Sequence, residues 1–205
     1  GIIESPKSPN PLLAATVADK SMARLLYSSL IENLQGEKSD LVLAESIDVS
    51  NDRQAFKVTL RPDIFFSNQT PITINDVIYS FNNSQLEKNY SVEKENERTA
   101  VFRLKKGATD NMLEIFLTPI VSPNETYSEN FSENQITSSS LKIKKVEKDA
   151  NGNLTRLELK RFDNGEAKLP YLETYTIIFY SDETLAYQAF QKKEIDLLTG
   201  VRSST

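Results

Sequence analysis

The sequence TPITINDVIYSF, residues 70–81, carries the clearest fold signal in the chain, a helix start followed at once by an apolar stripe. The stripe consists of Ile74, Val77, Ile78 and Phe81. Their spacing of three and four residues places these side chains on one side of a helix. Thr73 is suited to cap the first turn, and Asp76 completes a capping box at the positive end of the helix dipole. The stretch therefore predicts an amphipathic helix that packs on a hydrophobic core.

Three hairpins are predicted from segments in which apolar and polar side chains alternate, which is the period of a half-buried strand. The first hairpin joins residues 43–50 and 54–61, and the second lies within residues 91–107. The third joins residues 141–149 and 154–162 across an Asn-Gly pair, a strong short-range hairpin signal. The chain is therefore expected to be rich in antiparallel strand pairs.

Two more helices are predicted before residue 120. One is an apolar-striped segment that is expected to begin at Asp19 or Ser21. The other is a short helix capped at Thr109 or Asp110 and ended by Pro119. Its inward side chains are expected to be Leu113, Phe116 and Leu117.

The end of the chain predicts a crossover. Residues 171–180 are expected to form an apolar strand, and Ser181 is suited to cap a helix over residues 182–193. Residues 194–200 are expected to form a last short strand. A strand, a helix and a strand in this order favour parallel pairing. The sequence therefore predicts a mixed α/β protein.

Length and composition predict a folded chain. With 205 residues and 39% hydrophobic content, it can bury a core and has the length of one large domain or two small sublobes. No stretch reaches the run of about 18 apolar residues that a membrane-spanning helix needs. The first ten residues, GIIESPKSPN, lack the basic and apolar regions of a signal peptide, so any signal or lipid anchor is expected to have been removed.

Composition also excludes several kinds of chemistry. Acidic residues outnumber basic ones by 29 to 24, so we expect no nucleic-acid partner. The chain has no Cys and no His, which excludes the usual zinc sites, disulfides, thiol chemistry and imidazole catalysis. We therefore predict no metal site, no cofactor and no catalytic residue.

The serine run Ser138-Ser139-Ser140 is a feature that could supply a nucleophile. A serine nucleophile needs a base and an oxyanion hole, and because the base could not be His, a Ser-Lys arrangement is what this hypothesis requires. A serine run before a strand is ordinarily a loop, and we favour that interpretation.

The order of the predicted segments carries more information than any one of them. Asn10-Pro11, Asp19 and LLYSSL at residues 25–30 are followed by LAES at residues 43–46 and by the helix quoted above. This series resembles the family 5 extracellular solute-binding proteins, which serve peptide and nickel ABC importers. The quoted helix then looks like a scaffold helix of the smaller sublobe in such a binding protein.

The resemblance implies a fold and a domain organisation. The expected fold is a periplasmic-binding-protein-like lobe of the class II type with an antiparallel α+β insert sublobe. Residues 1–33 and 136–205 are expected to form part of the first ligand-binding lobe, and residues 34–135 the insert. Members of the family are usually more than twice as long, so the second lobe is expected to be absent and the chain to be an N-terminal fragment.

The resemblance also implies a site. Ala15, Thr16 and Val17 are expected to lie at the ligand cleft, with the loop of Ser138, Ser139 and Ser140 nearby. An alternative is that residues 15–17 are a buried strand entry. The chain departs from the family at this loop, where Gly-Thr-Gly-Pro is common, and at Gln69 and Lys193, where glycine is common. These departures concern the local shape of the cleft.

The function that the resemblance implies is that of the substrate-binding component of an ABC importer, without enzymatic activity. Such a component binds a peptide-like solute in the cleft between its lobes and delivers it to the membrane permease. We expect an extracytoplasmic monomer, in the periplasm or at the cell surface, with no membrane contact except a removed lipid anchor. Nickel is disfavoured because imidazole and thiolate ligands are absent. The alternatives are another solute such as an oligosaccharide, a surface interaction module that retains the fold without transport, and a Ser-Lys enzyme.

Overall fold

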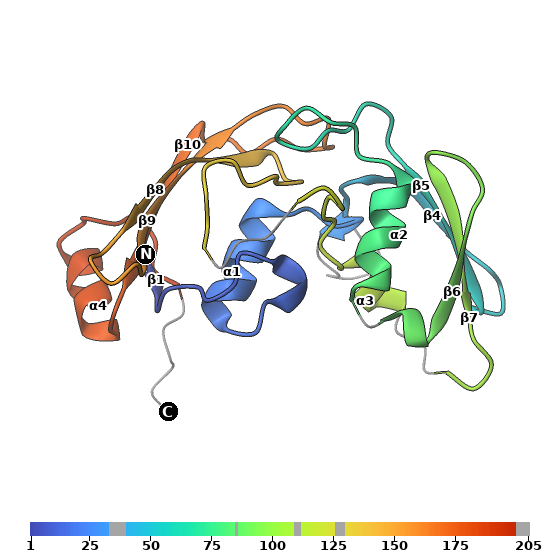
Figure 1. Ribbon diagram of the computed structural model, residues 1–205, viewed down its shortest axis with the longest axis horizontal. Helices are drawn as coiled ribbons and strands as arrows, with labels where there is room; N and C mark the ends of the chain where they lie inside the picture. Colours follow the sequence, from blue (N-terminus) through green and yellow to red (C-terminus); the bar gives the residue numbers. More distant parts are fainter. Residues whose placement is uncertain (33–39, 85, 109–111, 126–129, 200–205) are drawn as a thin grey trace.

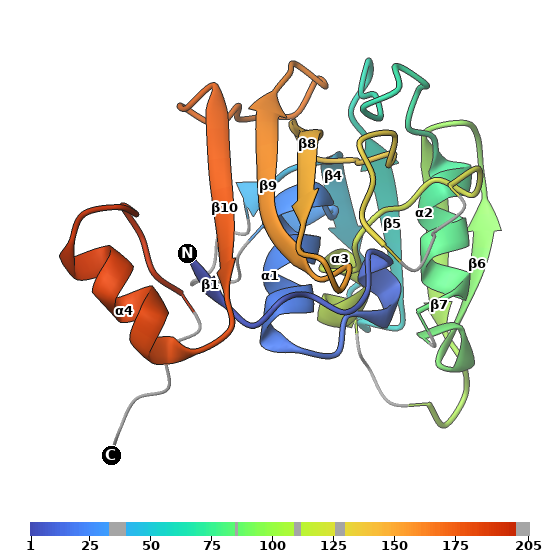
Figure 2. The ribbon, with the colours of Figure 1, turned by 60° about the vertical axis from the view of Figure 1, so that its left-hand side comes forward.

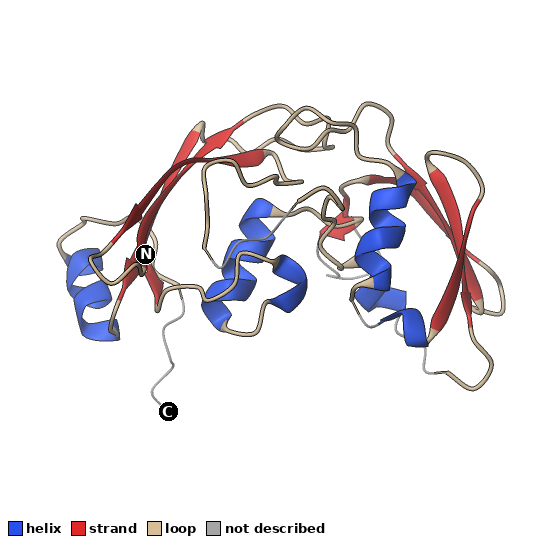
Figure 3. Cartoon of the chain, in the orientation of Figure 1, coloured by secondary structure: helices blue, strands red, loops and turns tan. Residues whose placement is uncertain are grey.

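The computed structural model describes residues 1–32, 40–84, 86–108, 112–125 and 130–199 (Figure 1). The molecule is elongated and arched, with one large β-sheet toward each end and helix α1 (Val17–Leu26) between them. Figure 3, which colours helices and strands separately, shows that α1 lies on the inner side of the arch. The mixed α/β class predicted from the sequence is confirmed.

The sheet at one end has four antiparallel strands in the order β4-β5-β7-β6. They are β4 (Ala44–Val49), β5 (Ala55–Leu60), β6 (Tyr90–Lys94) and β7 (Thr99–Leu104). The first two predicted hairpins are therefore confirmed. Phe56 and Phe102, on neighbouring strands, are buried and stack with their ring centroids 4.8 Å apart. The alternation in the sequence thus turns one face of this sheet into a core.

Helix α2 (Ile74–Asn82) packs on that face and confirms the helix predicted from residues 70–81 (Figure 1). Thr73 is its N-cap, and Asp76 completes the capping box. The Asp76 carboxylate accepts hydrogen bonds from the Thr73 amide at 2.7 Å and from the Thr73 hydroxyl at 2.9 Å. Phe81 meets Phe102 edge to face at 5.2 Å, which joins the helix to the sheet.

Helix α3 (Met112–Phe116) differs from its prediction in the face that it buries. Met112, Ile115 and Phe116 are buried, whereas Leu113 and Leu117 are 48% and 42% exposed. The buried set and the predicted set have the same helical spacing and differ by one residue in phase. A helix of five residues is too short for periodicity to fix that phase. The predicted caps at residues 109 and 110 lie outside the described residues.

The sheet at the other end has the strand order β1-β10-β9-β8 (Figure 2). Its strands are β1 (Ile2–Ile3), β8 (Leu141–Lys148), β9 (Leu154–Arg161) and β10 (Thr174–Tyr180). The hairpin predicted around the Asn-Gly pair is confirmed, and Gly152 supplies the positive φ of +83° that its turn requires. Met22 and Leu26 of α1 belong to the same buried cluster as Leu157 and Leu159 of β9.

The crossover at the end of the chain is present in part. Helix α4 (Glu183–Gln191) follows β10, and its N-cap is Asp182, whose carboxylate accepts from the Leu185 amide at 2.9 Å, rather than Ser181. In place of the predicted last strand, the described residues show a single parallel bridge between Thr199 and Ile2. The chain's own β1 lies between this bridge and β10, and pairs with β10 in parallel.

Two buried clusters divide the core. One contains residues from β4 to β7, α2 and α3, together with Leu30 and Ile120. The other contains residues from α1 and the β1-β10-β9-β8 sheet, together with Val121 and Phe131.

The domain boundaries predicted from the sequence, at residues 33/34 and 135/136, stay a prediction. The remaining elements are β2 (Ile31–Glu32) paired with β3 (Asp40–Leu41), and the 3-10 helices η1 (Pro11–Leu13) and η2 (Leu86–Lys88).

Gln69 and Lys193, the two single positions at which the family commonly has glycine, both adopt left-handed backbone conformations. Their φ angles are +68° and +59°. Lys193 follows the C-terminus of α4, where its amide bonds to the Phe190 carbonyl and the Glu194 amide bonds to the Ala189 carbonyl. This is the Schellman arrangement, in which glycine is the usual residue because a Cβ atom is strained there.

We predict that Lys193→Gly and Gln69→Gly each raise the free energy of unfolding by about 0.5–1 kcal/mol, because relief of left-handed strain exceeds the added backbone entropy. Lys192→Gly is the matched control, since Lys192 has a right-handed φ of −77° and should lose roughly 0.5–1 kcal/mol. Urea unfolding followed by circular dichroism measures all three. If Lys193→Gly lowered the free energy of unfolding as Lys192→Gly is expected to do, the argument from left-handed strain would be wrong.

Candidate functional site

The N-terminus of α1 is fixed by one buried carboxylate. Thr16 is the N-cap, and Asp19, which the sequence suggested as a cap, is the third helical residue of a capping box. The Asp19 carboxylate accepts backbone hydrogen bonds from Lys7 at 2.6 Å, Ser8 at 3.0 Å, Ala15 at 3.3 Å and Thr16 at 3.0 Å. It therefore ties the segment before η1 and the segment before α1 to the same point.

The hydrogen bonds at Asp19 and Asp76 give the two buried aspartates opposite pKa shifts. Burial opposes ionisation of Asp19, but the amides of Thr16, Ser8 and Lys7 and the Thr16 side chain together hold the pKa of Asp19 below its ordinary 3.8. At Asp76, burial outweighs the amide and hydroxyl of Thr73 and raises the pKa above 3.8. The balance between the burial of the carboxylate and its hydrogen-bond donors decides the direction of the pKa shift.

The predicted residues Ala15, Thr16 and Val17 form the entry to α1. Ala15 and Val17 are exposed and Thr16 is half-buried, so the alternative of a buried strand entry does not apply. Leu13 and Val17 are each 67% exposed, a large fraction for apolar side chains on a backbone held by Asp19. We call residues 13–17 the entry segment. It presents an apolar surface in a fixed conformation.

The predicted serines lie at the other end of α1. Ser138, Ser139 and Ser140 are buried. The Ser138 hydroxyl donates to the Ile120 carbonyl at 2.6 Å, and the Ser139 hydroxyl donates to the Leu25 carbonyl at 2.7 Å. The Ser140 hydroxyl donates to the Glu166 carboxylate. The bond from Ser139 holds the loop to α1. Each of the three hydroxyls is committed as a donor, which argues against the Ser-Lys hypothesis.

Ser139 and Ser140 also line a pocket of about 670 Å³ at the C-terminal end of α1. We call it the α1 C-terminal pocket. Neither Ser138 nor any residue of the entry segment lines it. Other lining residues come from the last turn of α1, from β2 and β3, and from the loop of residues 166–171. Structure thus separates the predicted site residues between the two ends of one helix.

Glu166 is a polar group that lines the pocket, and no periodic pattern in the sequence indicates it. Its two carboxylate oxygens accept hydrogen bonds from the hydroxyls of Ser28 and Ser140. The preceding residues place it: the Asn164 side chain donates to the Ser138 carbonyl at 3.0 Å, and Gly165 has a φ of +81°. A Cβ atom at Gly165 would lie 2.1 Å from the Asp63 carbonyl oxygen, so glycine is required there.

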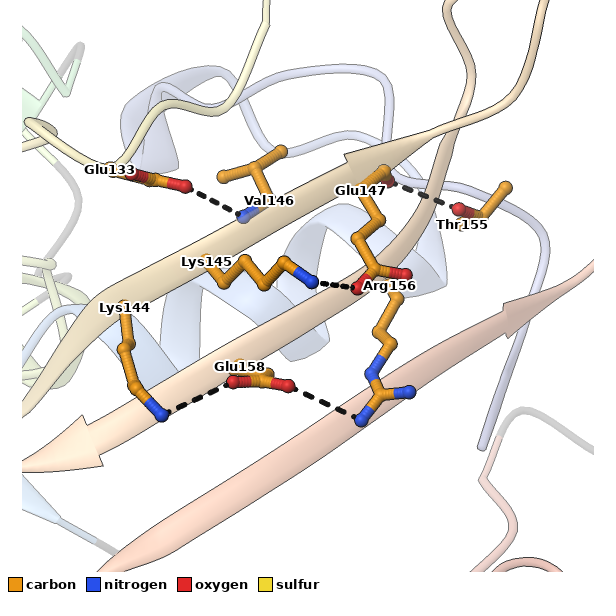
Figure 4. Close-up of polar contacts among 8 residues, drawn as sticks. All are labelled: Glu133, Lys144, Lys145, Val146, Glu147, Thr155, Arg156 and Glu158. Atoms are coloured by element: carbon orange, nitrogen blue, oxygen red, sulfur yellow. Dashed lines mark hydrogen bonds and ion pairs between the residues drawn. The ribbon is translucent and has the colours of Figure 1, made fainter.

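The outer face of β8 and β9 carries a charged network, shown in Figure 4. Lys144 lies 3.4 Å and Arg156 lies 3.3 Å from the Glu158 carboxylate, and Lys145 lies 2.6 Å from Glu147. The hydrogen bond to Glu147 and its charge raise the pKa of Lys145. The adjacent lysines are thus matched by carboxylates on the same two strands. We interpret the network as a solvated sheet face.

Among the described residues, no group of three or more acidic side chains is placed to hold a metal ion. No helix in the described part of the chain has the length and apolar character needed to cross a lipid bilayer.

Comparison with known proteins places the chain in a class of binding proteins. Residues 40–205 match the model of the bacterial extracellular solute-binding proteins, family 5 middle region. The chain therefore belongs to family 5 of the bacterial extracellular solute-binding proteins, which confirms the resemblance inferred from its segments. No curated protein sequence matches the chain.

Several solved structures share the fold. The oligopeptide-binding protein AppA of Bacillus subtilis, in complex with a nonapeptide, superposes with a TM-score of 0.77 at 21% identity over 96% of this chain and 43% of its own. MoaA of A. tumefaciens R10, in complex with mannopinic acid, superposes with a TM-score of 0.77 at 18% identity, over 97% of this chain and 44% of MoaA. The ABC transporter substrate-binding protein CtaP of Listeria monocytogenes superposes with a TM-score of 0.77 at 22% identity, over 96% of this chain and 43% of CtaP.

This chain spans less than half the length of those structures, so it corresponds to one lobe of the periplasmic-binding-protein fold.

We predict that Asp19→Asn lowers the free energy of unfolding by roughly 2 kcal/mol at neutral pH, because hydrogen bonds to a charged acceptor are lost or weakened. The stability that Asp19 contributes is present above its ordinary pKa of 3.8 and is lost as the pH falls through its lower native pKa. The difference between wild type and variant should therefore shrink below pH about 4. Urea unfolding at a series of pH values measures it.

The control for this prediction is Asp48→Asn, an exposed carboxylate in β4, which should change stability little. A difference at Asp19 that stays constant with pH would show that the carboxylate charge is not what holds the helix.

Proposed function

We propose that the chain is the substrate-binding component of an ABC importer and that it binds a peptide-like solute for delivery to a membrane permease. Its membership of family 5 and its likeness to AppA and CtaP support this proposal. The location that accompanies this function is extracytoplasmic, with a monomer as the working unit and a lipid anchor as its means of membrane attachment.

The entry segment is the observation that carries the proposal. Leu13 and Val17 are exposed apolar side chains on a backbone that the Asp19 carboxylate fixes from four amides. Because the backbone of the entry segment is already fixed, binding an extended solute there does not incur the entropy cost of ordering the segment. Extended peptides bind such surfaces largely through backbone contacts, which tolerate many side chains and need neither imidazole nor thiolate.

Within this proposal, Ala15, Thr16 and Val17 contact the solute, and Ser138, Ser139 and Ser140 fix the far end of the helix that carries them. The Ser139 hydroxyl bonds to the Leu25 carbonyl, and the amides of Ser138 and Ser139 bond to the Leu26 carbonyl, so the role of this loop is to position α1. Binding without chemistry follows, since the chain also lacks His and Cys.

The same exposed side chains support one second candidate, a surface interaction module that keeps the fold without transport. An apolar surface that meets another protein and one that meets a solute are both exposed in isolation. The two hypotheses differ in whether a small solute raises the stability of the protein.

We predict that short peptides raise the melting temperature of the natural protein that carries this sequence, because a ligand that binds only the folded state stabilises it. Val17→Asp should weaken peptide binding about tenfold, since it removes the burial of one valine, worth roughly 1.5 kcal/mol. An aspartate at the first position of α1 is favourable to the helix dipole, so the variant is expected to fold.

The matched control is Val49→Asp, which makes the same change at an exposed valine of β4, away from the entry segment. This variant should keep the rise in melting temperature that peptides cause. A shift with sugars in place of peptides would identify another solute class. No shift with any peptide, sugar or metal salt would overturn the transport proposal in favour of the interaction module.

A further inference from the structure

We propose that the α1 C-terminal pocket is a second binding site, which takes a cationic group, ammonium or guanidinium, carried on a short apolar stem. The site lies at the opposite end of α1 from the entry segment, and ten helical residues separate the two by about 15 Å. The proposal concerns the pocket alone and does not depend on delivery to an importer.

The polar groups at the floor of the pocket are available as acceptors. The hydroxyls of Ser28 and Ser140 donate to the Glu166 carboxylate. The Ser29 hydroxyl donates to the Ile31 carbonyl at 2.6 Å. Carboxylates and carbonyls cannot donate, so the direction of these bonds is fixed by chemistry.

An acceptor-rich floor selects the chemistry of its ligand. Each serine oxygen keeps lone pairs, and the Glu166 carboxylate, with about four lone-pair sites, has used two of them for Ser28 and Ser140. The ammonium group offers three donors and no acceptor, and guanidinium offers five. A neutral hydroxyl brings fewer donors and no charge, and a carboxylate ligand would face Glu166 with the same sign.

Among the lining residues that the structure describes, the charges leave Glu166 unbalanced. Four charged residues at the rim are exposed and contribute equal numbers of each sign. They are Arg24, Lys168, Glu32 and Asp40. Lys168 lies 3.2 Å from Asp40, which neutralises one pair. Glu166 is half-buried inside this rim, and the negative end of the α1 dipole points to the same region, so the interior favours a cation.

The walls of the pocket suit an apolar stem. Leu25, Ile31, Leu41, Leu117 and Pro119 line it and contribute aliphatic surface above the floor. A pocket with apolar walls and a few convergent polar groups is the usual form of a small-molecule site. The combination matches a lysine-like or alkylammonium group, whose stem and head differ in the same way.

The test compares two probes of the same shape, n-butylammonium and 1-butanol, titrated into the full chain and followed by ligand-observed NMR. We expect n-butylammonium to bind roughly tenfold or more tightly, since a charge-assisted hydrogen bond distinguishes it. Equal affinity of the two probes would overturn the proposal.

Three variants assign the binding to the pocket. Glu166→Gln should remove the preference for the ammonium probe, whereas Glu147→Gln, the same change in the network of Figure 4, should leave the preference unchanged. Lys168→Met removes an exposed rim cation and leaves Asp40 without this partner, so it should tighten ammonium binding about two- to threefold.

Circular dichroism establishes whether each variant is folded. If Glu166→Gln does not fold, Lys168→Met alone tests whether n-butylammonium binds in the α1 C-terminal pocket. An unchanged or weaker affinity of Lys168→Met for n-butylammonium would show that the cation binds outside this pocket. Peptide binding that survives in Glu166→Gln separates this site from the entry segment. Loss of peptide binding in a folded Glu166→Gln would show that the two are one site.

Discussion

The buried carboxylate of Asp19 is the constraint that fixes the path of the chain from residue 7 into α1. A charge removed from water without partners would cost far more than the helix around it can supply. Asp19 is 2% exposed, and four backbone amides, from residues 7, 8, 15 and 16, satisfy it. Because these amides belong to two segments on either side of η1, satisfying one carboxylate fixes the path of the chain into α1. The exposed surface of the entry segment follows from that path.

The other end of α1 is where the two cores are joined. The Leu26 carbonyl accepts from the amides of Ser138 and Ser139, both at 3.2 Å, and the Ile120 amide donates to the Ser28 carbonyl at 2.9 Å. The chain passes from one buried cluster to the other near each of these points, between Tyr27 and Leu30, between Ile120 and Val121, and again before Leu141. Buried backbone groups need partners at every passage, and the serine loop supplies them. Met22 and Leu26 of α1 belong to the cluster of the β1-β10-β9-β8 sheet, and the C-terminal end of the helix lies where the chain passes from one cluster to the other.

Periodic elements could be predicted from the sequence, whereas contacts between segments that are distant in the sequence could not. The hairpins and α2 were predictable because each has a period long enough to distinguish its faces and a cap or turn that marks its end. Thr16 followed three residues later by Asp19 has the same capping signature as Thr73 and Asp76, so the start of α1 could have been found from the sequence. The two-residue strand β1 has no period to detect, and its pairing with β10 was not predictable.

The candidate site divides in the same way. The resemblance assigned Ala15, Thr16 and Val17 to the cleft, and that assignment stays a prediction. The structure adds that Leu13 and Val17 are exposed. The α1 C-terminal pocket draws on four segments that are far apart in the sequence, and Glu166 enters it through a loop that Asn164 and Gly165 position. No local pattern encodes that juxtaposition, so only the three-dimensional structure could reveal it.

The replaced glycines have two different physical consequences. At Gln69 and Lys193 the left-handed conformation is retained, so the fold dictates the backbone and the side chain is accommodated at a cost. Among the described residues of positive φ, none belongs to the serine loop, so glycine is not needed there for its conformational freedom. Serine instead adds hydroxyls that hold Leu25, Ile120 and Glu166. The bond from Ser140 is one of the two that orient Glu166, and a glycine could not make it. At the loop where the resemblance implies Gly-Thr-Gly-Pro, this chain therefore supplies one of the two hydroxyls that orient Glu166 in the pocket.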